Sequence, residues 1–200
     1  MIDQFITQLN QWVVLDASDE YYIRQNLKIR HFKKKELILR EGQISKAFYF
    51  NLKGVVRLFY LKGVEERTCY FYPVGTFISA YESFTRAVPS KMNLQAMTDC
   101  ALVEITVETA AKLLAFSPKF EALARIGMEQ ELIVQQEIIA SLLMRTPEER
   151  YAYMLEEHAD LFQDIPQHYI ASYIGVQPES LSRIKKRHYL RNLNQRQGFN

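Results

Sequence analysis

A cluster of cationic side chains without any carboxylate lies near the end of the sequence. Between residues 183 and 200 there are six Lys or Arg residues and no Asp or Glu: Arg183, Lys185, Lys186, Arg187, Arg191 and Arg196. Such a cluster can make charge-assisted hydrogen bonds with phosphate oxygens. The whole chain is nearly balanced, with 25 basic and 23 acidic side chains. The basic character is therefore local, which excludes a general binder of polyanions.

Apolar residues around this cluster have helical spacing. Ile170 and Ile174 are four positions apart, and Leu181 and Ile184 are three apart, so each pair shares one face of a helix. Between the pairs, Gly175 can take the left-handed conformation that ends a helix. The pattern predicts two short helices joined by a tight turn, which is the helix-turn-helix layout.

Two further residues favour this layout. Pro178 can open the second helix, and Ala171 is small where two crossing helices must approach each other. The residues left outside are polar or cationic: Gln177, Glu179, Ser180, Ser182, Arg183, Lys186 and Arg187. An ordinary helical hairpin with a solvated basic face is the alternative. Because the small, turn-forming, apolar and basic residues coincide in register, we favour a helix that enters the major groove of double-stranded DNA.

A long helix is predicted to precede this unit. Ser117-Pro118 provides a cap and a proline at the first helical position, and the helix can run over 118–143, about 39 Å. Its apolar residues cover more than one face, so we expect it to pack on its own chain and on a second copy, as a homodimer. Thr146-Pro147-Glu148-Glu149 predicts a capping box and a junction near 144–146. The next helix is expected over 147–160.

The first half of the chain changes from helical to alternating patterns. Residues 1–30 are helical in character, with Ser18 as a candidate cap. Short runs rich in β-branched and aromatic residues follow at 36–42, 47–52, 55–61, 67–72, 92–97 and 101–105. Thr106 is then a candidate cap for another helix. We predict an α+β protein with an N-terminal β-roll or jelly roll.

Composition excludes several classes of protein. Two cysteines, Cys69 and Cys100, are too few for a disulfide framework or a structural zinc site, and reduced core thiols are expected. The first residues, MIDQFITQLNQWVVLD, lack the basic and apolar regions of a signal peptide. No window approaches the length of apolar sequence that a membrane helix needs. We therefore expect a cytoplasmic protein with no membrane partner.

The chain resembles the Crp/Fnr family of bacterial transcription regulators over nearly its whole length. The resemblance rests on GQISKAFYFNLKGVVRLFY (42–60), on FYPVGTFIS (71–79) and, most specifically, on IASYIGVQPESLSRIKK (170–186). It implies a sensor domain like a cyclic-nucleotide-binding domain at 1–117, a dimerisation helix at 118–145 and a helix-turn-helix domain at 146–200. It also implies homodimers on inverted-repeat DNA sites, and RNA polymerase as a partner.

The resemblance assigns roles to the second helix of the unit. Glu179 and Arg183 match a Glu and an Arg that read base edges in the family, where Glu accepts from cytosine and Arg donates to guanine. A third family contact, an Arg, aligns with Pro178, so we expect a different site preference. Contacts with the DNA backbone are expected from Gln177, Ser180, Ser182, Lys185, Lys186 and Arg187. Only 12 residues follow His188, so we expect a stub or tail rather than the two-stranded wing of many members.

The cyclic-nucleotide cassette lacks its two key groups. By alignment, Ala80 stands where the family has a ribose-binding Glu, and Ser90, followed by Lys91, stands near the phosphate-binding Arg. Lys91 or Arg86 could substitute, yet we do not expect cyclic AMP, and no cofactor is assigned. A different effector is expected among Phe77, Ile78, Tyr81, Phe84, Lys91, Met92 and Leu94. The alternative is that these side chains fill their own cavity.

Two other functions compete with DNA binding. A jelly roll can host a metal-dependent enzyme, but only His31 of the four histidines lies near the strands, so neither catalytic nor metal-ligating residues are assigned. The cysteines also cannot supply the four thiolates of an iron–sulfur cluster. The second alternative is a ligand-binding module whose helix-turn-helix serves only protein contacts.

Overall fold

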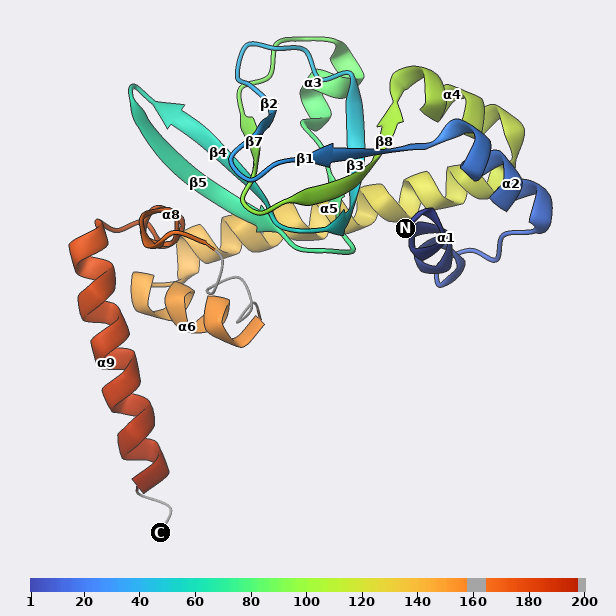
Figure 1. The fold of residues 1–200 in the computed structure, drawn as a ribbon. Helices are drawn as coiled ribbons and strands as arrows, with labels where there is room; N and C mark the ends of the chain where they lie inside the picture. Colours follow the sequence, from blue (N-terminus) through green and yellow to red (C-terminus); the bar gives the residue numbers. More distant parts are fainter. Residues whose placement is uncertain (158–164, 198–200) are drawn as a thin grey trace.

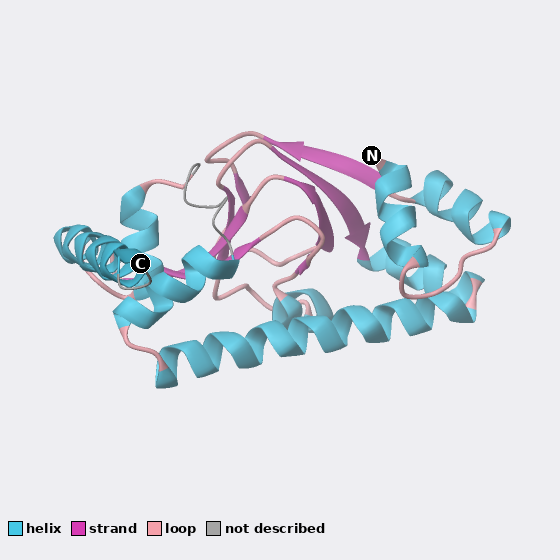
Figure 2. Cartoon of the chain, turned by 90° about the horizontal axis from the view of Figure 1, so that it is seen from below, coloured by secondary structure: helices cyan, strands magenta, loops and turns pink. Residues whose placement is uncertain are grey.

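The computed structural model describes residues 1–157 and 165–197, and Figures 1 and 2 draw it from two directions. The chain starts with the helices α1 (Ile2–Asn10) and α2 (Ala17–Asn26). The strands are β1 (Lys28–Phe32), β2 (Leu37–Leu39), β3 (Ala47–Lys53), β4 (Val56–Lys62), β5 (Glu65–Tyr72), β6 (Phe77–Ile78), β7 (Asn93–Ala96) and β8 (Cys100–Thr106). The other described helices are α3 (Tyr81–Arg86), α4 (Val107–Phe116), α5 (Pro118–Met144), α6 (Pro147–Glu157), α8 (Gln167–Ile174) and α9 (Pro178–Gln197).

The described strands form two antiparallel sheets of four strands each, which confirms the α+β fold with a β-roll. Their orders are β1-β8-β3-β6 and β2-β7-β4-β5. The six predicted strands correspond to β2, β3, β4, β5, β7 and β8. Two strands and the short helix α3 were not predicted individually. β1 (KIRHF) mixes charged and apolar residues, and β6 has only two residues, so neither carries a clear alternating pattern.

Alternation along the central strands separates two cores. In β3, Phe48 and Phe50 face a cluster that contains side chains of α1, α2, α4 and α5, whereas Tyr49 packs in the cluster that joins the two sheets. In β8, Val103 likewise packs in the cluster with the helices, and Leu102 packs in the cluster that joins the two sheets. β3 and β8 therefore have buried side chains on both faces, and they hold the helices against the roll.

The N-terminal helices begin at a different cap from the one expected. Asp16, not Ser18, caps α2: its carboxylate accepts from the backbone N–H groups of Ser18 and Asp19. Asp19 completes a capping box by accepting from the Asp16 backbone N–H. A carboxylate at this position also stabilises the positive end of the helix dipole, which a serine hydroxyl does less well. The expected caps Thr106 and Ser117 are confirmed.

Helix α5 runs along the length of the molecule beneath the strands (Figure 2). One of its faces packs on the chain through Phe120, Leu123 and Ile138, as expected. Where it crosses β6, a Cβ atom at Gly127 would lie 3.0 Å from the Phe77 ring, so glycine allows this close approach without displacing the ring. A different face leaves large apolar side chains exposed: Met128, Leu132, Ile139, Leu142 and Leu143.

A third core joins the C-terminal helices to the roll. Its buried members include Met154 and Ile170 from the helices and Phe71 and Val55 from the roll. The capping box at Thr146 is confirmed, since its backbone N–H donates to Glu149 at 2.7 Å. Helix α6 is described to Glu157, so the rest of the range expected for it lies outside the described residues. None of the described helices is long and apolar enough to cross a membrane.

The last helix is longer than expected. The second helix of the turn unit was expected to be short, followed by a stub after His188, but α9 extends from Pro178 to Gln197. The sequence has no Gly or Pro between Pro178 and Gly198, so nothing in it stops the helix earlier. Figure 1 shows α9 extending away from the rest of the molecule. Up to Gln197 the described chain forms no wing strand.

Candidate nucleic-acid interface

The turn between α8 and α9 is built around Gly175. This residue has φ +77°, in the left-handed region, and caps α8. Its backbone N–H donates to Ser172, and the N–H of Val176 donates to Ala171 at 2.9 Å, which closes the helix end. Ala171 is buried at the contact between the helices. The predicted helix-turn-helix geometry is confirmed in these details.

Arg150 of α6 binds the same turn through hydrogen bonds. Its Nε and Nη2 atoms donate to the Ile174 carbonyl at 3.0 and 2.7 Å. Its Nη1 atom donates to the carbonyls of Arg145 and Ser141, at the end of α5. A cation at the carboxyl ends of two helices satisfies carbonyls that lack partners within the helix. One side chain thus connects α5, α6 and α8.

The outward face of α9 carries the two residues expected to read bases. Leu181 and Ile184 point into the core, with at most 3% of their surface exposed. Glu179, Arg183 and Lys186 follow a spacing of four and three residues, so they share the opposite face, and all three are exposed. We call these three residues the reading face. It presents two cations and one carboxylate side by side.

The expected backbone-contact residues divide into two groups. Gln177 and Ser182 are exposed beside the reading face, and Ser180 is half-buried. Lys185 and Arg187 lie on the flanks of α9 and make contacts within the protein, with Gln167 of α8 and Glu148 of α6. Burial lowers the pKa of the Lys185 ammonium. The structure thus brings only part of this set to one surface.

A buried arginine holds α8 against the β4–β5 hairpin. The Arg57 side chain is fully buried, and its Cζ atom lies 4.0 Å from the ring centre of Phe59 and 3.8 Å from that of Tyr169 in α8. Its guanidinium donates to Gln95 at 3.1 Å and pairs with Glu66. Burial lowers the Arg57 pKa from its ordinary value, and the Glu66 carboxylate opposes that shift.

Hydrogen bonds extend this contact. The Ser172 hydroxyl accepts from the backbone N–H of Thr68 and donates to the carbonyl of Glu66, both at 2.9 Å. Beside it, the ring centres of Phe71 and Tyr173 are 5.5 Å apart. The polar and aromatic contacts fix the first helix of the unit on the roll, while α9 remains outside (Figure 1).

At the two cassette positions that bind a cyclic nucleotide in the family, this chain has small, buried side chains. Ala80 and Ser90 are 2% and 4% exposed, and the Ser90 hydroxyl already donates to the Met92 carbonyl and accepts from its N–H. The Lys91 ammonium lies 3.1 Å from a Glu82 carboxylate oxygen, and Arg86 pairs with the same carboxylate. The two cations that could replace the family arginine therefore share one carboxylate, that of Glu82.

The expected effector residues do not all share one surface. Phe77 packs with the helix cluster, close to Trp12 and Phe50, while Ile78, Met92 and Leu94 belong to the cluster between the sheets. Tyr81 is exposed, Phe84 contacts Phe48 edge to face, and Lys91 pairs with Glu82. The effector site at these positions stays a prediction. Among the described residues, no group of three His, Cys, Asp or Glu side chains could hold a metal.

Arg57 and Arg150 were missed by sequence reasoning. Both act across more than twenty positions of sequence, and neither the 42–60 signature that contains Arg57 nor the capping box before Arg150 indicates their partners. The spacing that predicts helices and strands carries no information about such partners. For Arg57, an arginine flanked by Val56 and Leu58 in an apolar strand is the only local signal.

Comparisons with known proteins find the same fold in solved structures and a family match for the roll. Residues 29–115 match the model of the cyclic nucleotide-binding domain family. A putative transcriptional regulator of the Crp/Fnr family from Eubacterium rectale has a TM-score of 0.71 and 18% identity, covering 92% of this chain and 88% of its own. No curated protein matches the sequence significantly.

Two further solved structures have the same fold. The c-di-GMP responsive global regulator CLP of Xanthomonas campestris has a TM-score of 0.66 and 17% identity, covering 89% of this chain and 94% of its own. FixK2 from Bradyrhizobium japonicum has a TM-score of 0.69 and 16% identity, covering 83% of this chain and 86% of its own. Residues 29–115 are therefore similar to the cyclic nucleotide-binding domain family, and the described part of the chain has the fold of these three solved regulators.

Proposed function

We propose that this protein is a homodimeric transcription regulator that binds double-stranded DNA at inverted-repeat sites. The observation that carries the proposal is the reading face of α9, defined by Glu179, Arg183 and Lys186. It lies on a helix that extends away from the molecule and is held by a glycine turn of helix-turn-helix geometry. A helix with these features fits the major groove.

Each residue of the reading face has a distinct part in the proposal. Arg183 donates to guanine O6 and N7, and Glu179 accepts from cytosine N4, so both select sequence. Lys186 contacts phosphate, as do Gln177, Ser180 and Ser182. Lys185 and Arg187 mainly hold α9 on α8 and α6, which is supported by their contacts with Gln167 and Glu148.

The exposed apolar face of α5 supports the homodimer. Met128, Leu132, Gln135, Ile139 and Leu142 alternate at steps of four and three residues. This is the spacing of a coiled-coil seam, and all but Gln135 are large apolar side chains more than half exposed in the single chain. Pairing along this seam places two copies of α9 on one DNA. Half-sites are then about one turn, or about 34 Å, apart.

In this proposal the chain has three functional parts. Residues 1–117 are a sensor domain, 118–145 the dimerisation helix and 146–200 the DNA-binding domain. Cyclic AMP is not expected as the effector, because Ala80 and Ser90 supply neither the carboxylate nor the guanidinium that binds it in the family. RNA polymerase as a partner rests on the resemblance alone, and a cytoplasmic location stays an expectation from the sequence.

Selection of bound sequences from random DNA tests the proposal directly. The expected product is an inverted repeat whose binding weakens steeply as salt increases. Arg183→Ala should lose about tenfold or more in affinity for the selected site, with relaxed preference at one base pair in each half-site. Lys186→Ala should weaken all sequences to a similar extent and lower the dependence on salt.

Lys112→Ala is the matched control. Lys112 is an exposed cation of α4 that pairs with Glu108, far along the chain from α9, and its loss should leave DNA binding unchanged. The proposal fails if no sequence is enriched and no complex forms at low salt. It also fails if Arg183→Ala and Lys112→Ala bind alike. Calorimetry with cyclic AMP and cyclic GMP should detect no tight binding.

A further inference from the structure

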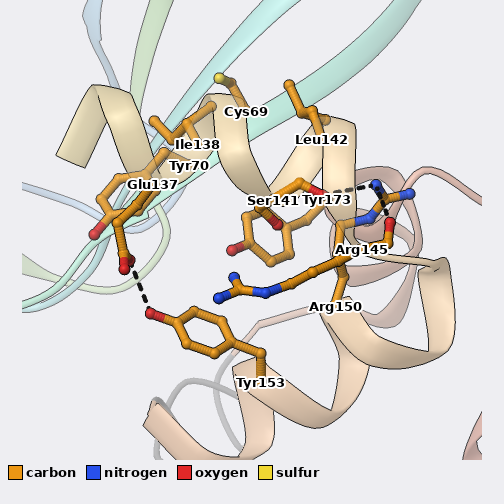
Figure 3. Close-up of a pocket in the computed structure, with 10 residues that line it drawn as sticks. All are labelled: Cys69, Tyr70, Glu137, Ile138, Ser141, Leu142, Arg145, Arg150, Tyr153 and Tyr173. Carbon is orange, nitrogen blue, oxygen red and sulfur yellow. Dashed lines mark hydrogen bonds between the residues drawn. The ribbon is translucent and has the colours of Figure 1, made fainter. Parts of the chain in front are cut away.

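The orientation of the reading face relative to α5 depends on how α8 is held. At the carboxyl end of α5, Arg150 donates to the carbonyls of Ser141 and Arg145, and Figure 3 draws both hydrogen bonds. The same side chain donates to Ile174 of α8. Helix α8 also lies on the roll, and the Gly175 turn connects it to α9. The contacts of α8 with α6 and with the roll together determine the direction in which α9 extends.

The apolar part of the contact with the roll holds α8 without fixing its angle. Ile170 of α8 packs in the same core as Phe71 and Val55 of the roll. Apolar burial depends on the area removed from water and is not directional. Such a contact tolerates a small slide or rotation of α8 across the roll. A fixed orientation requires groups whose interactions depend on geometry, and the same contact contains two of them, Ser172 and Arg57.

Ser172 binds the free edge of the second sheet. β5 is the last strand in the order β2-β7-β4-β5, so its outer backbone groups have no partner among the described strands. The Ser172 hydroxyl accepts from the N–H of Thr68 and donates to the carbonyl of Glu66, each at 2.9 Å. A slide of α8 by about 1 Å along the strand would stretch these hydrogen bonds beyond about 3.5 Å and break one or both. This hydroxyl therefore fixes the register of α8 on β5.

Arg57 orients α8 through a stacking contact. Its Cζ atom lies 3.8 Å from the ring centre of Tyr169 in α8. The side chains of Thr68, Glu66 and Gln95 hydrogen-bond to the same guanidinium, so strands β5 and β7 hold its plane. A cation–π contact requires the cation to lie over the face of the ring. Tyr169, and with it α8, is thus aligned with a plane that the roll sets.

A buried arginine is a poor choice at this position if stability alone is required. The Arg57 Nε–H group has no hydrogen-bond partner among the described residues. A buried donor without a partner lowers stability. Well-packed apolar residues of similar volume often stabilise a contact as well as buried ionic groups do. What the guanidinium adds to this contact is a defined direction.

We propose that Arg57 and Ser172 are positioning residues that set the distance between the two half-sites that the protein recognises. This inference rests on the proposed function, since it requires a dimer along α5 with both reading faces on one DNA. In such a dimer the angle of α8 on the roll fixes the separation of the two copies of α9. Adjacent base pairs are about 3.4 Å and about 34° apart, so a small rotation of α8 is sufficient to change the preferred spacing.

DNA sites with altered spacing test the positioning role. The full-length protein is titrated with the selected palindrome, with versions whose spacer is one or two base pairs shorter or longer, and with a single half-site. The natural protein should bind the palindrome at least about tenfold more tightly than any altered spacing, because simultaneous contact requires matching geometry. In Ser172→Ala and in Arg57→Met this ratio should fall to about threefold or less. Their affinity for the half-site should stay the same, because the reading face is unchanged.

The choice of variants separates positioning from stability. Arg57→Met keeps an unbranched side chain that can pack on Tyr169, and Ser172→Ala removes one half-buried hydroxyl. Thr7→Ala is the matched control, because it removes an exposed hydroxyl of α1 that donates to the Asp3 carbonyl. The control should keep the natural preference for one spacing. A merely structural role would weaken binding to the half-site and to every palindrome by the same factor.

A wrong positioning role gives a different result from a wrong function. The positioning role is wrong, and the proposed function stands, if Ser172→Ala and Arg57→Met keep the spacing preference of Thr7→Ala. The same conclusion follows if they weaken all sites equally, or if the natural protein binds every spacing alike but more tightly than the half-site. If no palindrome is bound more tightly than the half-site, two reading faces do not act on one DNA. The proposed function then fails, and the positioning role fails with it.

Discussion

At the scale of single residues, Gly175 combines two requirements at one position. It has φ +77°, and a Cβ atom placed there would lie 3.1 Å from Arg150 Nη2. The first requirement comes from the turn between α8 and α9 and the second from the guanidinium that binds the Ile174 carbonyl. Because Gly175 has no side chain, the chain can make the turn and the Arg150 guanidinium can still reach the Ile174 carbonyl.

Gly175→Ala should lower the free energy of unfolding by about 2 kcal/mol. About 1 kcal/mol comes from the left-handed conformation and the rest from displacement of the Arg150 guanidinium. Gly63→Ala is the matched control, because Gly63 has φ +65° with nothing within 4 Å of the added atom. Urea unfolding of both variants measures the difference. If the two variants lose the same stability, the contact with Arg150 contributes nothing.

Gly175 was predictable from the sequence, whereas its partner was not. A glycine between two pairs of apolar residues is a local signal for a helix end, and Pro178 marks the next start. Arg150 reaches the turn from α6, and Arg57 reaches α8 from β4, across 24 and 112 positions respectively. Partners at such distances follow from the packing of whole elements, which spacing along the chain does not encode.

At the scale of elements, Arg57 joins α8 to the β4–β5 hairpin. Arg57→Ala should lower the free energy of unfolding by about 2–3 kcal/mol, because it removes two stacking contacts and the hydrogen bonds of a buried guanidinium. Arg67→Ala, which removes an exposed cation of β5, should cost less than about 0.5 kcal/mol. Chemical denaturation measures both. Equal losses would contradict the role given to the buried side chain.

Helix α5 contacts the roll through the half-buried carboxyl group of Glu131. Tyr72 and Gln135 donate to Glu131 at 3.3 and 3.1 Å, yet burial raises the pKa of Glu131 above its ordinary value. The folded state therefore holds this proton more tightly than the unfolded state. The contribution of Glu131 to stability consequently falls as pH rises through the usual carboxyl range and then through the raised pKa.

Glu131→Gln should therefore stabilise the protein more at pH 7 than at pH 5 relative to the natural chain. The glutamine carbonyl can still accept from Tyr72, and the variant no longer buries a charge. Urea unfolding of both proteins at the two pH values gives the difference. Glu129→Gln changes an exposed residue of the same helix, so it should not reproduce the effect of Glu131→Gln on the free energy of unfolding. The prediction is contradicted if Glu131→Gln changes the free energy of unfolding by the same amount at both pH values.

The predictability of elements depends on their length and regularity. α5 was expected over 118–143 and is found at Pro118–Met144, because a cap, a proline and a long apolar pattern mark it. β6 has two residues and α3 six, too few to show a period. The reading face was predictable because α9 begins at a proline, while the inward contacts of Lys185 and Arg187 required the positions of α8 and α6.

At the scale of the whole molecule, the proposed function makes DNA affinity depend on whether two chains act together. The proposed seam on α5 contains Ile139, whereas Ile133 lies on another side of the same helix. The two residues are the same type and are 57% and 59% exposed in the single chain. A charge at Ile139 would be buried between the helices of a dimer, and a charge at Ile133 would remain in water.

Ile139→Glu should therefore produce monomers, and Ile133→Glu should leave the oligomeric state unchanged, as measured by sedimentation equilibrium. On DNA, the natural protein should bind the selected palindrome at least about a hundredfold more tightly than a single half-site, because the second contact is intramolecular. Ile139→Glu should abolish that difference while half-site binding stays the same. If Ile133→Glu has this effect instead, the chains pair through another face of α5. If neither variant changes the assembly, the dimer does not form through this helix.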